Sequence, residues 1–209
     1  EVVIARRPRS EPLHMAVDST GLKVFGEGEG KVRKHGYTKR RTWAASSTLG
    51  WTKRPRRCLA VLLTSAGVGD SQVLPELVEQ AEGPIEQVSG DGAYDTRESY
   101  RAIVSYGARP VIPPRANAKP WSEQSGHPEA PARNAALAAI TEGGEKQWKH
   151  DNGYHRRSLA ETARLRIKTL FGPTLKARSF PSQVAEAYVR CAALNRRTGM
   201  GMPESHAMA

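Results

Sequence analysis

The chain has little of what secreted and membrane-spanning proteins depend on. It contains two cysteines, Cys58 and Cys191, which cannot form a disulfide framework and do not have the spacing of metal ligands. The longest apolar run, Leu59 to Leu63, is far too short to cross a bilayer. We find no signal peptide at the start of the sequence. These absences argue against a disulfide-rich or membrane-bound protein, and we expect a reducing, cytoplasmic location with no membrane partner.

Acidic residues are scarce relative to basic ones. The 209 residues include 21 Asp and Glu against 32 Lys and Arg, which gives a formal net charge of +11. Such a field attracts polyanions, of which nucleic acid is the commonest inside cells. The alternative is a soluble basic protein without such a partner. The length favours one sizeable domain.

Hydrophobic periodicity and turn residues predict an alternating order of strands and helices. The expected strands cover residues 13–17, 59–64, 85–89 and 109–114, and the expected helices cover residues 71–81, 96–106, 133–141, 154–171 and 181–197. Residues 22–25 continue the first strand after a turn or bulge at Gly21. This order predicts an α/β fold in which the first strands pair antiparallel and helical crossovers join the later ones.

Two local features qualify this picture. The segment from Ala44 to Cys58 shows neither a two-residue nor a 3.6-residue period, so we predict that it does not form a regular strand. Asp70 and Asp95 each precede an expected helix, and we predict that they are its N-cap.

The helix expected over residues 154–171 carries a polar stripe. Its members step by three, four, three and four residues: Tyr154, Arg157, Glu161, Arg164 and Lys168. At that spacing the five side chains share one helix face. The simplest interpretation is a solvated face, in which an Arg157–Glu161 pair contributes about 0.2–0.5 kcal/mol.

Two aspartates stand where strands are expected to end. Asp18 precedes Ser-Thr-Gly, and Asp91 lies between Gly90 and Gly92, which let the backbone bend tightly and leave the carboxylate uncrowded. Each could instead be a turn residue that satisfies its own backbone. If both meet Glu161, the three like charges need a cation to coexist, and their hard oxygen ligands suit Mg²⁺ or Mn²⁺.

Residues 31–41 hold six Lys or Arg, among them Lys34, Lys39 and Arg40. This segment is either a loop that contacts phosphates or a solvated charge run.

Together these motifs resemble a known family. The residues that carry the resemblance are Val17-Asp18-Ser19-Thr20-Gly21, Gly90-Asp91-Gly92-Ala93-Tyr94 and the helical register of Tyr154, Arg157, Glu161 and Lys168. They are similar to the DDE transposases of bacterial insertion sequences, and most closely to the group called "five". The resemblance extends over nearly the whole chain.

The resemblance implies a ribonuclease H-like mixed sheet flanked by helices. It implies one catalytic domain over residues 1–209, with a short insertion at about 115–153 before the Glu-bearing helix. It also implies that the family's N-terminal DNA-binding region is missing here.

The implied activity is metal-dependent DNA cleavage and strand transfer at insertion-sequence ends. Asp18, Asp91 and Glu161 are the implied catalytic residues and ligands of two Mg²⁺ or Mn²⁺ ions, roughly 3.5–4 Å apart. Double-stranded DNA, with its terminal inverted repeats and target site, is the implied partner of a homodimer associated with the nucleoid. The implied DNA-binding residues are Tyr154, Arg157, Arg164, Lys168, Lys34, Lys39 and Arg40.

Three alternatives stay open. Arg157 either grips the DNA backbone or holds Glu161 ionised and oriented. The missing region and the irregular residues 44–58 are also compatible with a decayed remnant that binds DNA without cutting it. A nuclease of the same fold would cut DNA without joining the ends.

Overall fold

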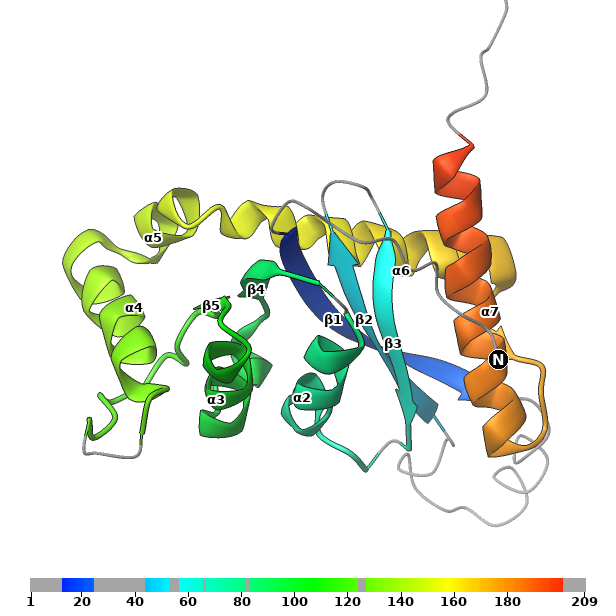
Figure 1. Cartoon of the computed structure of the whole chain (residues 1–209), viewed down its shortest axis with the longest axis horizontal. Helices are drawn as coiled ribbons and strands as arrows, with labels where there is room; N and C mark the ends of the chain where they lie inside the picture. Colours follow the sequence, from blue (N-terminus) through cyan, green and yellow to red (C-terminus); the bar gives the residue numbers. More distant parts are fainter. Residues whose placement is uncertain are drawn as a thin grey trace, which may run out of the picture.

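A six-stranded mixed sheet forms the centre of the molecule (Figure 1). The structure is a computed structural model that describes residues 13–24, 44–52, 57–65, 67–81, 83–123 and 127–200, with the backbone alone for residues 44–52. The strands are β1 (Leu13–Val24), β2 (Ala44–Thr52), β3 (Cys58–Thr64), β4 (Ile85–Ser89), β5 (Arg109–Val111) and β6 (Thr174–Leu175).

The strand order is β3-β2-β1-β4-β5, and β6 pairs with the far end of β1. The pairs β1–β2 and β2–β3 are antiparallel, whereas β1–β4, β4–β5 and β1–β6 are parallel. The α/β class, the early antiparallel pairing and the later helical crossovers are therefore confirmed.

Strand β1 is longer than its sequence predicts. It continues without a turn through Gly21, which pairs with Ser46, and its antiparallel register with β2 extends from Met15 to Lys23. The expected break at Gly21 is wrong because β2 supports the backbone of β1 along this whole length. Asp18 consequently lies inside the strand rather than at its end.

The prediction that residues 44–58 lack a regular strand is also wrong. Residues 44–52 form β2, an inner strand that is hydrogen-bonded to β1 on one edge and to β3 on the other. Strand propensity depends strongly on context, and an inner position supplies two rows of backbone hydrogen bonds. The pairing partners therefore determine the conformation of a segment that has no pattern of its own.

Helices cover both faces of the sheet. The helices are α2 (Asp70–Gln80), α3 (Arg97–Ser105), α4 (Ala130–Gly143), α5 (Glu145–Asp151), α6 (Ser158–Phe171) and α7 (Phe180–Gly199). Two 3-10 turns, η1 (Gly92–Tyr94) and η2 (Tyr154–Arg157), precede α3 and α6. None of the described helices is both long and apolar enough to span a membrane.

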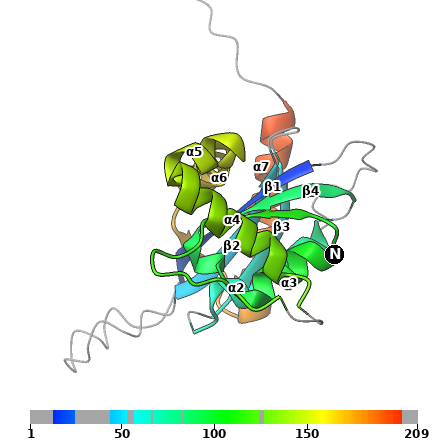
Figure 2. The same ribbon diagram turned by 90° about the vertical axis from the view of Figure 1, so that its left-hand side faces the viewer.

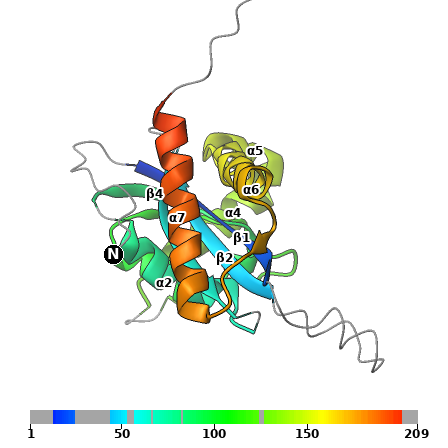
Figure 3. The ribbon, with the colours of Figure 1, turned by 90° about the vertical axis from the view of Figure 1, so that its right-hand side faces the viewer.

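Side chains of β1 alternate between two cores. Leu13, Met15 and Val17 pack with residues of α2 and α3, whereas Ala16 packs with residues of α6 and α7. Figure 3 shows α6 and α7 on this second face. Because successive strand residues point to opposite faces, Asp18 shares the α6 side with Ala16.

The two predicted N-caps are wrong. Gly69 caps α2, and Asp70 lies in the first helical turn, where it accepts a hydrogen bond from Ser19 Oγ (2.6 Å). Thr96 caps α3 by accepting from the backbone N–H of Ser99. Asp95 instead forms a long-range ion pair, which no local pattern could predict.

That ion pair anchors the insertion between β5 and α6. The insertion holds the expected α4 and the additional short helix α5 (Figure 2). Arg133 of α4 donates from Nε and Nη2 to the two oxygens of Asp95, at 2.8 and 3.2 Å, and from Nη1 to the Lys119 carbonyl. The Arg133 and Asp95 side chains are 4% and 2% exposed, so the pair is fully buried.

The two roles considered for Asp95 differ in their expected effect on stability. Asp95→Asn leaves the Arg133 charge buried without a counter-charge, and we expect it to lower the free energy of unfolding by about 3–5 kcal/mol. Thr96→Ala, which removes the actual cap, should lower it by about 1 kcal/mol. Urea denaturation measures both. Equal losses of about 1 kcal/mol in the two variants would contradict a structural role for the ion pair.

Candidate active site

The three predicted carboxylates come together where β1 and β4 separate. Parallel pairing of the two strands ends at Ala16 and Ser89, and Asp91 follows that end of β4 by two residues. Strand β1 continues past this point and carries Asp18 toward α6, whose first turn contains Glu161. Three elements that are distant in sequence therefore deliver one carboxylate each.

One guanidinium contacts all three acids. Arg157 donates from Nη2 to Asp18 Oδ1 (3.2 Å) and to Asp91 Oδ2 (3.2 Å), and from Nη1 to Glu161 Oε1 (2.9 Å). The Asp18 side chain is 8% exposed, whereas those of Asp91 and Glu161 are 42% and 48% exposed. The cluster thus has a buried floor and an open rim.

Asp18 is held in an environment that does not favour its charge. Burial raises the pKa of its carboxyl, the nearby Arg164 and Arg157 lower it, and the charges of Asp91 and Glu161 raise it further, so the net direction is upward. Arg164 lies 3.6 Å from Oδ2 through its Nε. This Oδ2 atom is buried and has no hydrogen-bond partner among the described residues.

Arg157 remains a cation in this position. Burial lowers the pKa of its guanidinium, but Tyr154 and the three carboxylates together outweigh burial and raise it. Its Nε is buried and finds no hydrogen-bond partner in the described part of the chain. The side chain is therefore fixed mainly by its contacts with the acids.

Asp91 has a second task in its own turn. Its Oδ1 accepts a hydrogen bond from the backbone N–H of Ala93 (2.9 Å) and so caps η1, while Oδ2 faces Arg157. The interpretation as a turn aspartate is therefore confirmed, and it leaves Asp91 in contact with the cluster. The turn fixes one oxygen and leaves the other for the cluster.

Gly90 is needed for space rather than for tight bending. A Cβ at Gly90 would lie 2.8 Å from Cδ2 of Tyr94 and 3.1 Å from Cγ2 of Val17. Neither Gly90 nor Gly92 has a positive φ. The close approach of Tyr94 beneath the turn explains the first glycine of the Gly-Asp-Gly motif and holds Asp91 near β1.

Three of the remaining predicted site residues lie in η2 or α6, and the other three lie outside the described residues. Arg164 on α6 contacts Asp18, and Tyr154 in η2 is half-buried against Trp148, with ring centroids 6.1 Å apart. Lys168 lies in the last turn of α6 and makes no ion pair with an acid in the described part of the chain. Lys34, Lys39 and Arg40 lie outside the described residues.

The predicted helix beginning at Tyr154 is only partly correct. Tyr154 to Arg157 form the 3-10 turn η2, and α6 begins at Ser158. The step from Arg157 to Glu161 nevertheless keeps the expected contact. The simplest interpretation, a solvated Arg157–Glu161 pair on an exposed helix face, is wrong for Arg157, because its side chain is only 17% exposed.

The three acids supply the kind of oxygen ligand that binds a divalent cation, but their side chains are not positioned to bind one in this structure. Carboxylate oxygens are the ligands that Mg²⁺ and Mn²⁺ prefer, and the unpartnered Oδ2 of Asp18 is a buried donor of this kind. Among the described residues, no three acidic, His or Cys side chains are placed to hold a metal as they stand. Here the Arg157 guanidinium lies among the carboxylates and acts as their counter-charge.

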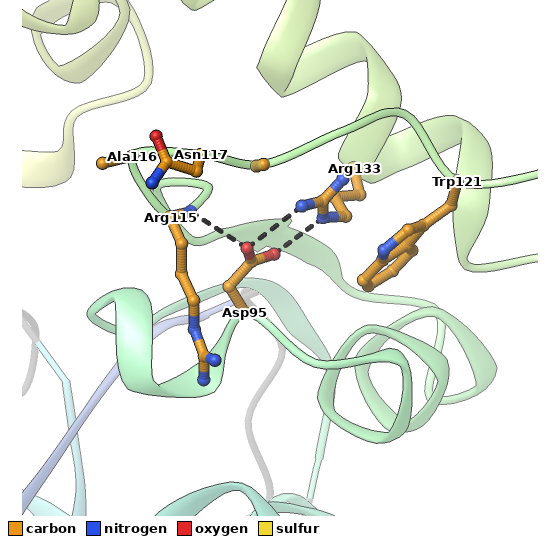
Figure 4. A pocket seen from close by; sticks show the side chains of 7 residues that line it. Asp95, Arg115, Ala116, Asn117, Trp121 and Arg133 are labelled. Carbon is orange, nitrogen blue, oxygen red and sulfur yellow. Dashed lines mark hydrogen bonds and ion pairs between the residues drawn. The ribbon is translucent and has the colours of Figure 1, made fainter.

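A pocket of about 510 Å³, which the sequence did not predict, lies next to the turn that carries Asp91. Its lining residues, shown in Figure 4, are Asp95, Arg115, Ala116, Asn117, Ala118, Trp121 and Arg133. The Arg133 guanidinium carbon lies 4.3 Å from the centroid of the Trp121 ring while the same side chain binds Asp95. These three pocket residues therefore also hold the segment between β5 and α6 in place. Arg115 Nε donates to the carbonyl of Gly92 (3.1 Å), which connects the pocket to the Asp91 turn.

Comparison with known proteins gives two findings. Residues 9–196 match the family described as "Transposase DDE domain". The fold is similar to a chain of the piggyBac transposase synaptic complex with hairpin DNA, solved by cryo-EM, with a TM-score of 0.55 and 11% sequence identity. The match covers 92% of this chain and 47% of that chain, so this chain spans about half the length of that transposase. The likeness shows a shared ribonuclease H-like fold.

The raised pKa of Asp18 has a testable consequence for stability. A carboxyl whose folded-state pKa exceeds its unfolded value, near 3.9, binds its proton more tightly when folded, so its ionised form disfavours folding at neutral pH. We expect Asp18→Asn to raise the free energy of unfolding at pH 7. This gain should fade as the pH falls through the raised pKa of Asp18 and should be absent below about 4.

The matched control is Asp95→Asn, which changes the other buried aspartate in the same way. Urea denaturation of both variants at pH 7 and pH 3 makes the comparison. A loss of stability at pH 7 in Asp18→Asn similar to that in Asp95→Asn would show that the arginines outweigh burial and would contradict the expected direction.

Proposed function

The chain belongs to the transposase DDE domain family, and on that premise we propose that Asp18, Asp91 and Glu161 are the catalytic carboxylates of metal-dependent DNA cleavage and strand transfer at insertion-sequence ends. The observation that carries the proposal is their meeting around one guanidinium within 3.2 Å. The three acids come from β1, the turn after β4 and α6, which are distant in sequence.

The three carboxylates would hold the divalent cations of the reaction. When bound, a pair of Mg²⁺ or Mn²⁺ ions supplies activation of a water or a DNA 3′-hydroxyl and charge stabilisation at the departing oxygen. Asp18 is the central ligand because it is the most buried of the three and has an oxygen without a hydrogen-bond partner. The η1 turn fixes Asp91, and the first turn of α6 fixes Glu161 at the rim.

The DNA backbone is bound by the basic residues around these acids. The formal net charge of +11 supports a polyanionic partner. Arg164, which also contacts Asp18, and Lys168 in the last turn continue the cationic face along α6. Tyr154 and Arg157 lie at the near end of this face, and Lys34, Lys39 and Arg40 would add phosphate contacts. The partner is double-stranded DNA with terminal inverted repeats and a target site, bound by a homodimer.

One of the two observations that favour an inactive, DNA-binding remnant does not hold in the structure. An irregular segment next to the strand of Asp18 would favour such a remnant, but residues 44–52 form the inner strand β2. Strand β1 is therefore paired beside Asp18, which is opposite Leu49. The remnant and the active enzyme are now distinguished by activity.

Cleavage of DNA that carries the cognate terminal repeats tests the proposal. In Mg²⁺ the wild-type protein should nick and join these ends, and Asp91→Asn or Glu161→Gln should lower the rate by roughly 1,000-fold, because charge stabilisation by the metal is worth several kcal/mol. Glu142→Gln, which changes an exposed acid on α4, is the matched control and should leave the rate unchanged. Cleavage that survives either site variant would remove the three-acid assignment, and binding without any cleavage would favour the remnant.

The salt dependence of DNA binding tests the basic face of α6. Loss of one phosphate contact in Lys168→Ala should reduce the slope of log affinity against log salt by about 0.9. Lys146→Ala, on the exposed part of α5, should leave the slope unchanged. Equal slopes for wild type and Lys168→Ala, measured by fluorescence anisotropy, would exclude Lys168 from the interface.

A further inference from the structure

Arg157 binds one oxygen of each of the three carboxylates that would hold a divalent cation. Its two terminal nitrogens donate hydrogen bonds to Oδ1 of Asp18, Oδ2 of Asp91 and Oε1 of Glu161. We infer that Arg157 is an internal counter-ion that competes with the divalent cation for the three acids, so that loading of the site releases this arginine. The inference rests on the proposed function, since it requires that the acids bind metal.

The acids need a cation at all times. Three carboxylates a few ångströms apart repel one another, and Asp18 is additionally disfavoured by burial. A single guanidinium that contacts all three offsets part of this repulsion when no metal is bound. The charge of two dications at this site would exceed that of the three carboxylates and leave Arg157 facing excess positive charge.

The surroundings of Arg157 permit its release. The residue joins η2 to α6, so its backbone is held by two helical turns, whereas its side-chain hydrogen bonds go to the three acids. Asp91 and Glu161 are partly exposed, which leaves an open rim next to the guanidinium. Rotation of the Arg157 side chain, without movement of a helix, can therefore move its guanidinium away from the three carboxylates.

Arg164 provides the contrast that makes the inference testable. It also carries a positive charge close to Asp18, but it approaches Oδ2 at 3.6 Å and makes no ion pair with Asp91 or Glu161 in the described part of the chain. Removal of either arginine changes the net charge near Asp18 by the same amount. Direct competition predicts a much larger effect for Arg157, whereas a general electrostatic effect predicts similar ones.

Release would give Arg157 its second role. Once the acids are occupied by metal, the guanidinium is free at the edge of the site, where it can bind a phosphate of the DNA backbone. The two interpretations of Arg157, as a partner of Glu161 and as a DNA ligand, then describe two states of one side chain. Because coupling between ligands is reciprocal, DNA that binds the released arginine would also tighten metal binding.

Binding of Mn²⁺ to the protein without DNA tests the competition. Free Mn²⁺ is measured by electron paramagnetic resonance at low concentrations of wild type, Arg157→Gln and Arg164→Gln, and circular dichroism checks that each variant is folded. We expect Arg157→Gln to bind Mn²⁺ about 10-fold more tightly than wild type, which corresponds to about 1.4 kcal/mol, and Arg164→Gln to change the affinity less than threefold.

Three results would overturn the inference. Unchanged or weaker binding in Arg157→Gln would show that the arginine organises the acids instead of competing for them. Equal tightening in both variants would show a general effect of charge. Absence of Mn²⁺ binding in all three proteins would remove the site itself. Intact Mn²⁺ binding with no cleavage of terminal-repeat DNA would contradict the proposed function and leave the competition standing.

The coupling to DNA gives an independent readout. In wild type, DNA affinity measured at constant ionic strength should rise when Mn²⁺ replaces EDTA. In Arg157→Gln this rise should be smaller, because no guanidinium is released. An equal rise in the two proteins would contradict the second role.

Discussion

Repulsion among three carboxylates is the constraint around which this structure is arranged. Asp18, Asp91 and Glu161 lie around the Arg157 guanidinium, which contacts each of them within 3.2 Å and, with Arg164 beside Asp18, offsets part of their repulsion. The scaffold is rigid where it has to hold Asp18, in a strand paired on its β2 edge, and open where Asp91 and Glu161 form the rim. An arrangement with this much like charge is unfavourable for folding alone, and such arrangements concentrate at functional sites.

The mixed sheet creates the opening that the acids occupy. Parallel pairing between β1 and β4 stops at Ala16 and Ser89, but antiparallel pairing with β2 carries β1 onward. The strand end of β4 therefore lies beside the middle of β1, and Asp91 reaches Asp18 across the gap. Helix α6 packs on this face through Ala160 and Ala163, small residues that keep it close to β1.

The sequence predicted what local pattern and residue spacing encode. The stripe on residues 154–168 and the two aspartate motifs were sufficient to identify the acids that converge, and the alternation of elements was sufficient for the fold class. It did not predict β2, whose conformation depends on partners on both edges, or the partners of Asp70 and Asp95, which lie 51 and 38 residues away in sequence. The bridging role of Arg157 was equally inaccessible, because it depends on contacts with Asp18 and Asp91 that only the folded sheet provides.

Two buried aspartates show how a structural carboxylate differs from a functional one. Asp95 is met by two nitrogens of Arg133 and by the backbone N–H of Arg115, so both its oxygens have partners. Asp18 is buried to a similar degree, yet one of its oxygens has no hydrogen-bond partner among the described residues and its pKa is raised. At Asp95, by contrast, the fold satisfies both oxygens of a buried ion pair. In the proposed function, the oxygen of Asp18 that has no partner is the one that binds the divalent cation.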